Sequence, residues 1–440
     1  MMKTSSKKQK KQKPEKDFDY TRTWYLLPHY PSDEKFFGHL YEGKVLHDKS
    51  AFRKRKDKSL TSRIRIADLT NVCRELSDPF IFPVTVDKKN RIVKADEYSW
   101  YTEKVQLLKP VNVWDVFPML ERIFPGTINL DGQPYLPLDL VFPEVIKGNL
   151  VLSHSTLPSR IKLPGVIEGG FEVTSCNIPP TWKLPRKMTR LFLHDSSFYS
   201  NVDLKKISVS AFWIEGCLHP SRLSIPKVFP GKFEIGQDDI TPEFTFPEEV
   251  EALVISESSL HESVHLSKRV TRELIIIDTK VSPGIFMPLS CKSFAAMDCE
   301  FPGDFKLPLS DLEEIEFVQC KLPANFRFPE LATCRKLSFN DMKIPPRLKL
   351  PQEFTGTLEF EGVRFLQSIK LPKILTGSLV IKHSTIPRKL KLPLNDAYEI
   401  IMYERDDTSM LTGPESVLSA ITFLEIPRFE PEPADNDLPF

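Results

Sequence analysis

The sequence predicts a mainly β repeat solenoid, in which about twelve coils of 21 residues stack their strands in parallel behind a small α+β domain. The first observation is a series of prolines, often in a Leu-Pro pair, with successive gaps of 20 to 22 residues or of 41. They are Pro143, Pro164, Pro185, Pro226, Pro247, Pro288, Pro308, Pro329, Pro351, Pro372 and Pro393. Each 41-residue gap lacks one proline, and Lys205 or Lys206 and Ser267 fill those places.

The second observation is an apolar-x-apolar pair in every coil, which is typical of a short strand with one buried face. The pairs are Leu150/Leu152, Phe171/Val173, Leu191/Leu193, Phe212/Ile214, Phe233/Ile235, Leu253/Ile255, Leu274/Ile276, Phe294/Ala296, Ile315/Phe317, Leu337/Phe339, Leu358/Phe360 and Leu379/Ile381. Three residues after each pair comes a small or compact residue, often Ser or Cys, which we call the slot residue. One strand per 21 residues favours a parallel stack over a ladder of hairpins.

The repeat unit L-x-L-x-x-(S/C)-x-I-P-x-x-L-x-L-P resembles the leucine-rich repeat, and its Leu-Pro punctuation is similar to the short LP-type repeats of secreted bacterial effectors. The resemblance implies a protein-binding scaffold with an effector or host-interaction role. LP-type relatives often carry a ubiquitin-ligase domain after the repeats. Here about 47 residues follow Pro393 and none is Cys, so we expect that activity to be absent. Two features depart from the usual leucine-rich repeat: Ser or Cys replaces its Asn, and the apolar residue before the strand, such as Ile146 or Ile167, lies four positions upstream where three is usual. Another kind of parallel β-solenoid therefore stays an alternative.

We divide the chain into a basic tail at 1–16, an α+β domain and cap at 17–135, the solenoid at 136–405, and a C-terminal cap with an acidic Pro-rich tail at 406–440. The spacing of apolar residues predicts a helix over 66–76. We also expect a second helix over 113–123 and a hairpin over 86–93. After the last Leu-Pro pair we expect a strand at 399–403 and a short helix at 415–421.

Bulk composition excludes several classes of protein. The net charge is +1, although residues 1–16 alone carry seven Lys and one Glu. Seven cysteines without a CxxC pair do not make a disulfide framework. The sequence holds neither a run of eighteen apolar residues nor a signal-peptide core at its start, so we expect no membrane span and a protein that is cytoplasmic or exported without a Sec signal.

The pattern HExxH occurs once, at His261, Glu262 and His265, and in metalloproteases it places two zinc ligands on one helix face. The repeat register puts this segment in an extended or turning part of its coil, so we predict no metal and no cofactor. Cys299 and Cys320 share the slot on adjacent coils, where a small apolar residue suits the core.

The residue between each apolar pair must point outward. Two neighbouring outward columns bring a group of apolar and aromatic side chains together on coils three to eight, and such a patch usually marks an interaction site. We predict partner contacts at Phe192, His194, Trp213, Val254, Ile275, Ile277 and Met297.

Two other functions compete with a protein-binding scaffold. One is an enzyme whose catalytic site lies in 17–135, with the repeats recruiting the substrate; His29, His39 and His47 there show no spacing that assembles a site. The other is binding of nucleic acid or an anionic surface through the basic N-terminus and the patch Arg53, Lys54, Arg55 and Lys56. The sequence leaves the oligomeric state open.

Overall fold

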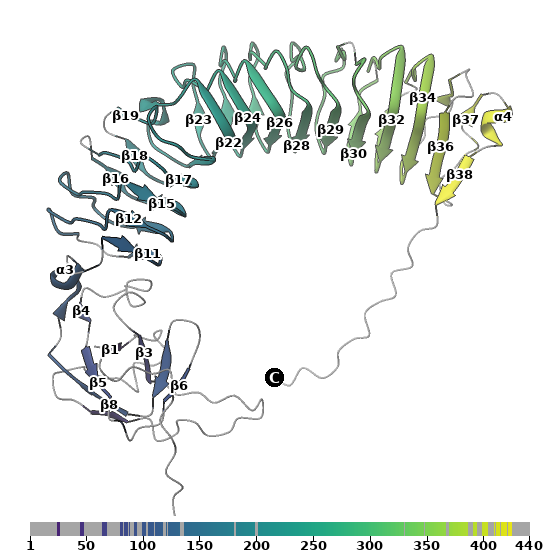
Figure 1. Ribbon diagram of the computed structural model, residues 1–440. Helices are drawn as coiled ribbons and strands as arrows, with labels where there is room; N and C mark the ends of the chain where they lie inside the picture. The colour runs from purple at the N-terminus through teal and green to yellow at the C-terminus, as the bar shows by residue number, and fades with distance from the viewer. Residues whose placement is uncertain are drawn as a thin grey trace, which may run out of the picture. The chain divides into compact units, whose positions relative to one another are not determined.

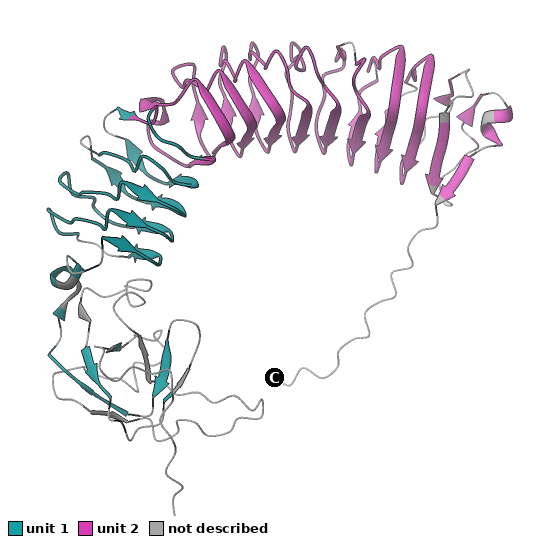
Figure 2. Ribbon diagram, in the orientation of Figure 1, with its two compact units in different colours: residues 1–202, 206–209 teal, residues 203–205, 210–440 magenta. Residues whose placement is uncertain are grey.

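The chain is a parallel β-solenoid preceded by an antiparallel sheet (Figure 1), and its described residues form almost no helix. The computed structural model describes residues 24–26, 45–47, 64–67, 80–81, 83–86, 88, 92–94, 99–102, 104–109, 111–117, 120, 122–132, 136–179, 182–198, 201–329, 331–346, 348–366, 369–385, 390–393, 398–403, 409, 411–413, 415–419 and 421–424. The chain divides into two compact units (Figure 2), one of residues 1–202 and 206–209 and one of 203–205 and 210–440.

The first unit opens with a seven-stranded antiparallel sheet in the order β2-β8-β5-β1-β3-β7-β6. Its strands are β1 (Trp24–Leu26), β2 (Val45–His47), β3 (Ile64–Ala67), β5 (Pro83–Thr85), β6 (Ile92–Lys94), β7 (Trp100–Thr102) and β8 (Lys104–Leu107). Two short strands, β4 (Phe80–Ile81) and β9 (Val111–Asn112), pair with each other beside it. Tyr25, Val84, Ile92, Val105 and Leu107 are buried here.

Three local predictions for this region are wrong. Ile66 lies in β3, paired with β1 and β7, so the predicted helix over 66–76 does not begin where the apolar spacing placed it; the rest of that range lies outside the described residues. The helix over 113–123 is one turn, α3 (Val113–Val116), and Ile123 begins β10 (Ile123–Phe124). β5 and β6 do not form the predicted hairpin because each pairs with other strands.

The first unit ends in the opening coils of the solenoid. Their main strands pair in parallel and in register, so Leu150 lies beside Phe171 and Phe171 beside Leu191. These strands are β11 (Ile128–Asp131), β13 (Leu150–Ser153), β15 (Gly170–Thr174) and β17 (Arg190–His194). A second ladder joins β10 to β12 (Val145–Ile146) and β14 (Val166–Ile167).

The second unit continues the same construction over residues 211–424. Its main strands pair in parallel with the next in chain order, except that the pairing shifts locally within β22–β24 and β24–β26. They are β20 (Ala211–Glu215), β22 (Val228–Gly236), β24 (Glu249–Ser256), β26 (Arg269–Ile277), β28 (Ser293–Met297), β29 (Glu314–Val318), β30 (Lys336–Asn340), β32 (Glu353–Glu361), β34 (Ile374–Lys382), β36 (Tyr398–Tyr403) and β38 (Ile421–Leu424). The expected strand at 399–403 is β36, and the expected C-terminal helix is the single turn α4 (Glu415–Leu418).

The predicted inward pairs form the core. Every residue of the twelve apolar pairs is buried, and stacked Phe rings on neighbouring coils contact one another, as in Phe317–Phe339 and Phe339–Phe360. Burying one such side chain contributes about 1.5–3 kcal/mol, so repetition over the coils supplies most of the favourable free energy. The described coils contain two short helical turns, η3 (Pro220–Arg222) and α4, and are otherwise mostly strand and irregular chain, in agreement with the prediction of a mainly β coil.

Each coil leaves its main strand through one residue with a left-handed backbone. The φ angle there lies between 42° and 70° in thirteen successive coils. The residues are Gly132, His154, Ser175, Asp195, Gly216, Gln237, Glu257, Asp278, Asp298, Gln319, Asp341, Gly362 and His383. Only three are glycines, although a side chain in this conformation costs about 1–2 kcal/mol. The regular turn therefore carries a repeated cost in free energy, and the hydrogen bonds between coils and the packed core offset that cost.

The periodic prolines lie in extended segments between ladders. In several coils the N–H of the residue after the proline donates to the preceding coil, as Gly165 does to the carbonyl of Glu144 and Arg186 to that of Gly165. Ser267, in a coil without the proline, has the same place as Pro164: both lie outside any strand, two residues after a bridged residue (His265 and Lys162). Its hydroxyl is buried without a partner among the described residues, and its N–H donates to no backbone carbonyl there.

We predict that Ser267→Pro stabilises the protein. The ring restricts the unfolded chain and removes an unpaired buried hydroxyl, so the free energy of unfolding should rise by about 1 kcal/mol. Denaturant unfolding of the full chain measures this change, and Ser267→Ala is the control because it removes only the hydroxyl. Lower stability of the proline variant than of the alanine variant would show that the site does not accept the repeat's proline.

Candidate partner-binding strand face

The outward residues of the main strands form one continuous surface on the second unit. We define the strand face as the outward residues of strands β20 to β34 together with the left-handed turn residue after each strand. Register pairing aligns them in columns, one of which runs Trp213, Glu234, Val254, Ile275 and Ala295. Neighbouring strands lie about 4.8 Å apart, so adjacent members of a column are close neighbours.

The apolar part of the strand face lies on β26, β28 and β29. Ile275 pairs with Ala295, and Ile277 pairs with Met297, which in turn pairs with Val318. Met297 is 41% exposed and the others are half-buried. The sequence therefore predicted correctly that Ile275, Ile277 and Met297 share one outward surface.

Val254 does not present the exposed side chain that the sequence suggested. It points outward on β24 but is only 4% exposed. Its column neighbours Glu234 and Ile275 flank it in register. A central strand position with larger side chains on both sides offers little surface to a partner.

Trp213 is half-buried and held by polar neighbours on the next strand. Its indole N–H donates to the carboxylate of Glu234. Lys232 lies 2.7 Å from the same carboxylate and 5.8 Å from the ring centroid of Trp213. This arrangement fixes the ring orientation and leaves one polar cluster at the β20 end of the strand face.

Phe192 and His194 lie on β17 in the first unit and form their own outward pair. Their rings stack with centroids 5.7 Å apart and planes 17° from parallel. His194 Nε2 is 3.6 Å from Asp195 Oδ2. Both side chains are half-buried, so the pair is a partly exposed aromatic surface on that unit.

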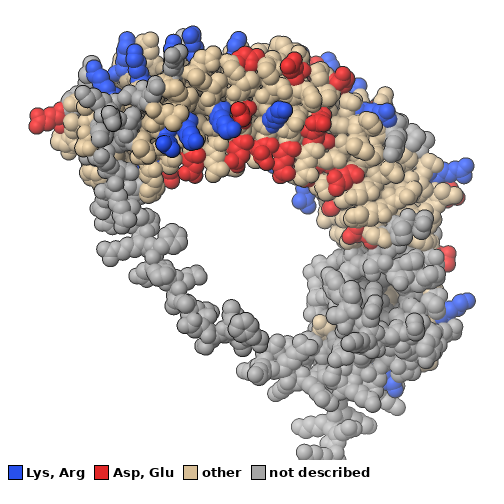
Figure 3. All heavy atoms as spheres, turned by 180° about the vertical axis from the view of Figure 1, so that it is seen from behind, with Lys and Arg blue, Asp and Glu red and all other residues tan. Residues whose placement is uncertain are grey.

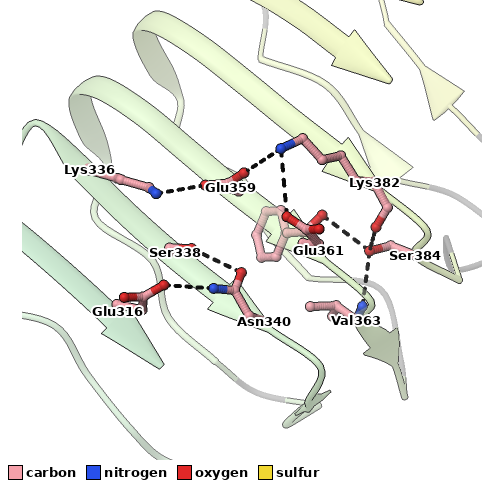
Figure 4. Close-up of polar contacts among 10 residues, drawn as sticks. Glu316, Lys336, Ser338, Asn340, Glu359, Glu361, Val363, Lys382 and Ser384 are labelled. Carbon is pink, nitrogen blue, oxygen red and sulfur yellow. Dashed lines mark hydrogen bonds and ion pairs between the residues drawn. The ribbon is translucent and has the colours of Figure 1, made fainter. Parts of the chain in front are cut away.

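The strand face becomes polar from β29 to β34. Asn340 donates to Glu316 at 2.8 Å and accepts a hydrogen bond from buried Ser338 at 3.0 Å (Figure 4). Glu359 receives Lys336 at 3.0 Å and Lys382 at 2.9 Å. Apolar and polar parts of the face are therefore separated along the stack.

The lysine pair controls the ionisation of Glu359. Its side chain is 11% exposed, and this burial works to raise the pKa. Hydrogen bonds from Lys382 and Lys336 outweigh burial, so the pKa lies below its ordinary value. Glu359 is thus an ionised, internally paired group whose charge the face already neutralises.

The slot residues form an inner column beside the strand face. Cys176, Ser196, Ser258, Thr279 and Ser384 each donate to the carbonyl two residues earlier, at 2.7 to 3.2 Å. In three places a slot atom also joins adjacent coils, because the hydroxyl of a Ser accepts the slot N–H of the coil before it. A side-chain ladder therefore accompanies the backbone ladders in the interior.

The slot cysteines are buried thiols. Cys299 and Cys320 lie on adjacent coils, 2% and 3% exposed, and a hydrogen bond between their side chains lowers the pKa of Cys299 and raises that of Cys320. Cys291 and Cys334 lie elsewhere in the coil, and burial raises their pKa values to about 12 and about 11. Cys291, Cys320 and Cys334 are therefore protonated at neutral pH, because the pKa of each lies above the ordinary value for Cys.

The HExxH segment is a turn, as its place in the repeat predicted. His265 pairs across the ladder with Phe286, and their rings stack with centroids 3.9 Å apart. His261 Nε2 is 3.8 Å from Asp239, and Glu262 is exposed. Within the described ranges, no group of three or more His, Cys, Asp or Glu is arranged to hold a metal ion.

The basic patch Arg53–Lys56 and residues His29 and His39 lie outside the described residues. In the part of the chain that the structure describes, no helix is long and apolar enough to span a bilayer. Comparison of the chain with models of protein families, with curated proteins and with solved structures gave no match.

Sequence reasoning missed the charged edge of the strand face. The left-handed turn residues precede the slot by one position, and on three successive coils they are Glu257, Asp278 and Asp298, all exposed. The only signal for this edge in the sequence was a polar residue or glycine at one fixed position of each repeat. Such a signal alone does not identify a charged surface, because polar residues fill many exposed positions.

One slot holds an acid. Asp238 is 6% exposed, and its Oδ2 has no partner among the described residues. Burial raises the pKa of Asp238 to about 7, helped by the nearby charges of Asp239 and Glu215, while a hydrogen bond from the backbone of Cys217 works to lower it. The folded protein therefore holds the proton that the unfolded chain releases near pH 3.8.

We predict that Asp238 lowers stability as pH rises. Because its folded pKa is above its unfolded value, stability falls between about pH 4 and about pH 7 and then levels off. Asp238→Ser, which restores a residue type common in the slot, should remove this component and stabilise the protein at about pH 8 by on the order of a few kcal/mol. Urea unfolding of both proteins across this range measures the difference. Identical pH profiles would contradict the assignment.

Proposed function

We propose that the chain is a protein-binding repeat scaffold that holds its partner on the strand face of the second unit. The observation that supports this proposal most strongly is a group of partly exposed apolar side chains on paired strands: Ile275, Ile277, Ala295, Met297 and Val318. An apolar surface of this kind on a protein is typical of an interaction site. Because backbone ladders fix each strand, the surface is formed before the partner arrives, which lowers the entropic cost of binding.

Within this surface, we propose different roles for the candidate residues. Ile275, Ile277 and Met297 supply apolar contact area, and Trp213 supplies an oriented aromatic ring at the edge of a polar cluster. Tryptophan is frequent among residues that dominate binding energy. Phe192 and His194 contribute a separate contact surface on the first unit. Val254 supports the face from below the surface and makes little direct contact, in line with its burial.

The LP-type resemblance of the repeats supports a host-interaction or effector role for this scaffold. It rests on the repeat sequence alone, and it is tested by drawing the candidate partners from both host and bacterial sources. Binding of nucleic acid through the basic N-terminus stays a separate hypothesis, since those residues lie outside the described part of the chain. The described strand face favours a protein partner because its many carboxylates repel phosphate.

We predict that the pair of substitutions Ile277→Thr and Met297→Gln weakens partner capture by about tenfold or more, because it removes apolar contact area from the strand face. The measurement is affinity capture by the full chain from host and bacterial lysates, followed by quantification of each retained protein. Thermal unfolding first shows that the variant keeps its fold.

The matched control is the pair Leu289→Thr and Leu309→Gln. These leucines are 60% and 63% exposed but lie outside the strand face, on neighbouring coils of the same unit. Their substitution should leave capture unchanged. If the control pair lost the partner while the strand-face pair retained it, the binding surface would lie on the other side of the coils.

A further inference from the structure

The strand face carries a strong excess of negative charge. It contains fourteen acidic residues, three lysines and two arginines. The acids are Glu215, Glu234, Glu249, Glu251, Glu257, Glu273, Asp278, Asp298, Glu314, Glu316, Asp341, Glu353, Glu359 and Glu361, and the cations are Lys232, Arg269, Arg272, Lys336 and Lys382. The whole chain has a net charge of only +1, so this face differs sharply from the molecule as a whole. Figure 3 shows acidic side chains gathered in a row over the coils of the second unit.

The five cations do not relieve the excess at the turn residues that follow the strands. Lys232 pairs with Glu234 at 2.7 Å, and Lys336 and Lys382 pair with Glu359 at 3.0 and 2.9 Å. Arg269 and Arg272 lie on β26 and pair with Glu249, Glu251 and Glu273 at 2.7 to 3.5 Å. The described lysines and arginines of the face are therefore already partnered by strand carboxylates and not by the turn carboxylates.

The central acids are free to meet a cation. Glu257, Asp278 and Asp298 occupy the same turn position on successive coils, and all three are exposed. No ion pair joins them to a Lys or Arg of the described residues, and Glu257 receives only a hydrogen bond from Gln237 at 3.3 Å. Stacked at the strand spacing of about 4.8 Å, the three carboxylates make one edge of the face strongly negative.

This acidic edge directly adjoins the apolar group. Ile277 precedes Asp278 in the chain, and Met297 precedes Asp298, so each apolar side chain lies beside a turn carboxylate. A partner seated here meets apolar contact surface and an unneutralised row of acids at once. Its complement is a segment that offers apolar side chains together with lysine or arginine.

We propose that the strand face recognises a cationic segment of a partner protein in which lysine or arginine residues are interspersed with apolar side chains. The inference rests on the proposed function and adds the chemistry of the partner to it. The apolar side chains contact Ile275, Ile277 and Met297, while the cations lie along the edge formed by Glu257, Asp278 and Asp298. Steering by the acidic edge speeds association, and the apolar contacts keep part of the affinity at high salt.

The test uses the full chain and short fluorescein-labelled peptides in which lysine alternates with leucine. Controls are an alternating glutamate–leucine peptide and an alternating lysine–serine peptide, and fluorescence anisotropy gives each Kd. We expect the lysine–leucine peptide to bind at least tenfold more tightly than either control. Equal binding of the glutamate peptide, or equal binding of the lysine–serine peptide, would overturn the proposal.

A variant that changes only charge then tests whether the peptide binds to the strand face. Asp278→Asn with Asp298→Asn keeps the side-chain shape, and Asn is tolerated in a left-handed turn. We expect this pair to weaken the lysine–leucine peptide at least threefold. The control pair is Glu262→Gln with Asp304→Asn, two exposed acids outside the strand face, where the new amide of residue 304 keeps an acceptor for the N–H of Gly284. Equal weakening by both pairs would contradict the location.

Removing residues 1–16 separates an internal occupant from a foreign one. That segment carries seven lysines and could itself supply the cations. Unchanged peptide affinity after its removal supports a foreign segment, and a gain of tenfold or more would overturn the proposal in favour of the chain's own tail. Capture of a partner through Ile277 and Met297 without any peptide preference would leave the scaffold function standing and reject only the cationic chemistry.

Discussion

The backbone hydrogen bonds between successive coils hold this structure in register, and every other feature depends on that register. Because Leu274 lies beside Phe294, and Phe294 beside Ile315, one choice of pairing fixes the core, the slot and both outward columns together. A slip of one residue would turn the buried pairs to solvent and the carboxylates inward, at a prohibitive cost. Repetition makes the register robust, since each coil is held by two neighbours.

The same register explains why unfavourable local choices recur. Ten of the thirteen turn residues have side chains in a left-handed backbone, where glycine would be unstrained. The coil has to leave its strand at that point for the slot residue to enter the core. At Asp238 the slot itself is unfavourable, because an acid lies where the other coils have Ser, Thr, Cys, Met or Val. Such costs are tolerable in a stack whose core gains free energy from every coil.

The periodic part of the fold could be predicted because the same buried apolar pair recurs about every 21 residues. The apolar pairs and the prolines placed all twelve expected strands, and the low helix content of the described coils followed from the space that 21 residues leave. The non-periodic start could not be predicted in this way. The apolar spacing of Ile66, Leu69 and Val72 is helical, yet Ile66 belongs to a strand, since pairing with β1 and β7 overrides local preference.

The candidate site was predictable in direction but not in exposure or charge. Alternation along a strand shows that Ile275 and Val254 point outward, but only the neighbours in three dimensions reveal that Val254 is covered. The acidic edge depends on turn residues from separate coils, which are about twenty positions apart in the chain and adjacent in the fold. The acidic edge thus follows from stacking, and the sequence of one coil does not contain it.

The most direct test of the central claim, that the partner lies on the strand face, is site-specific photocrosslinking. A photoreactive amino acid replaces Met297 on the face or Leu309 outside it, both of them exposed side chains of the second unit. Illumination of the full chain in lysate should attach a partner at position 297 and leave position 309 unlinked. Crosslinking of that partner at 309 and not at 297 would contradict the account.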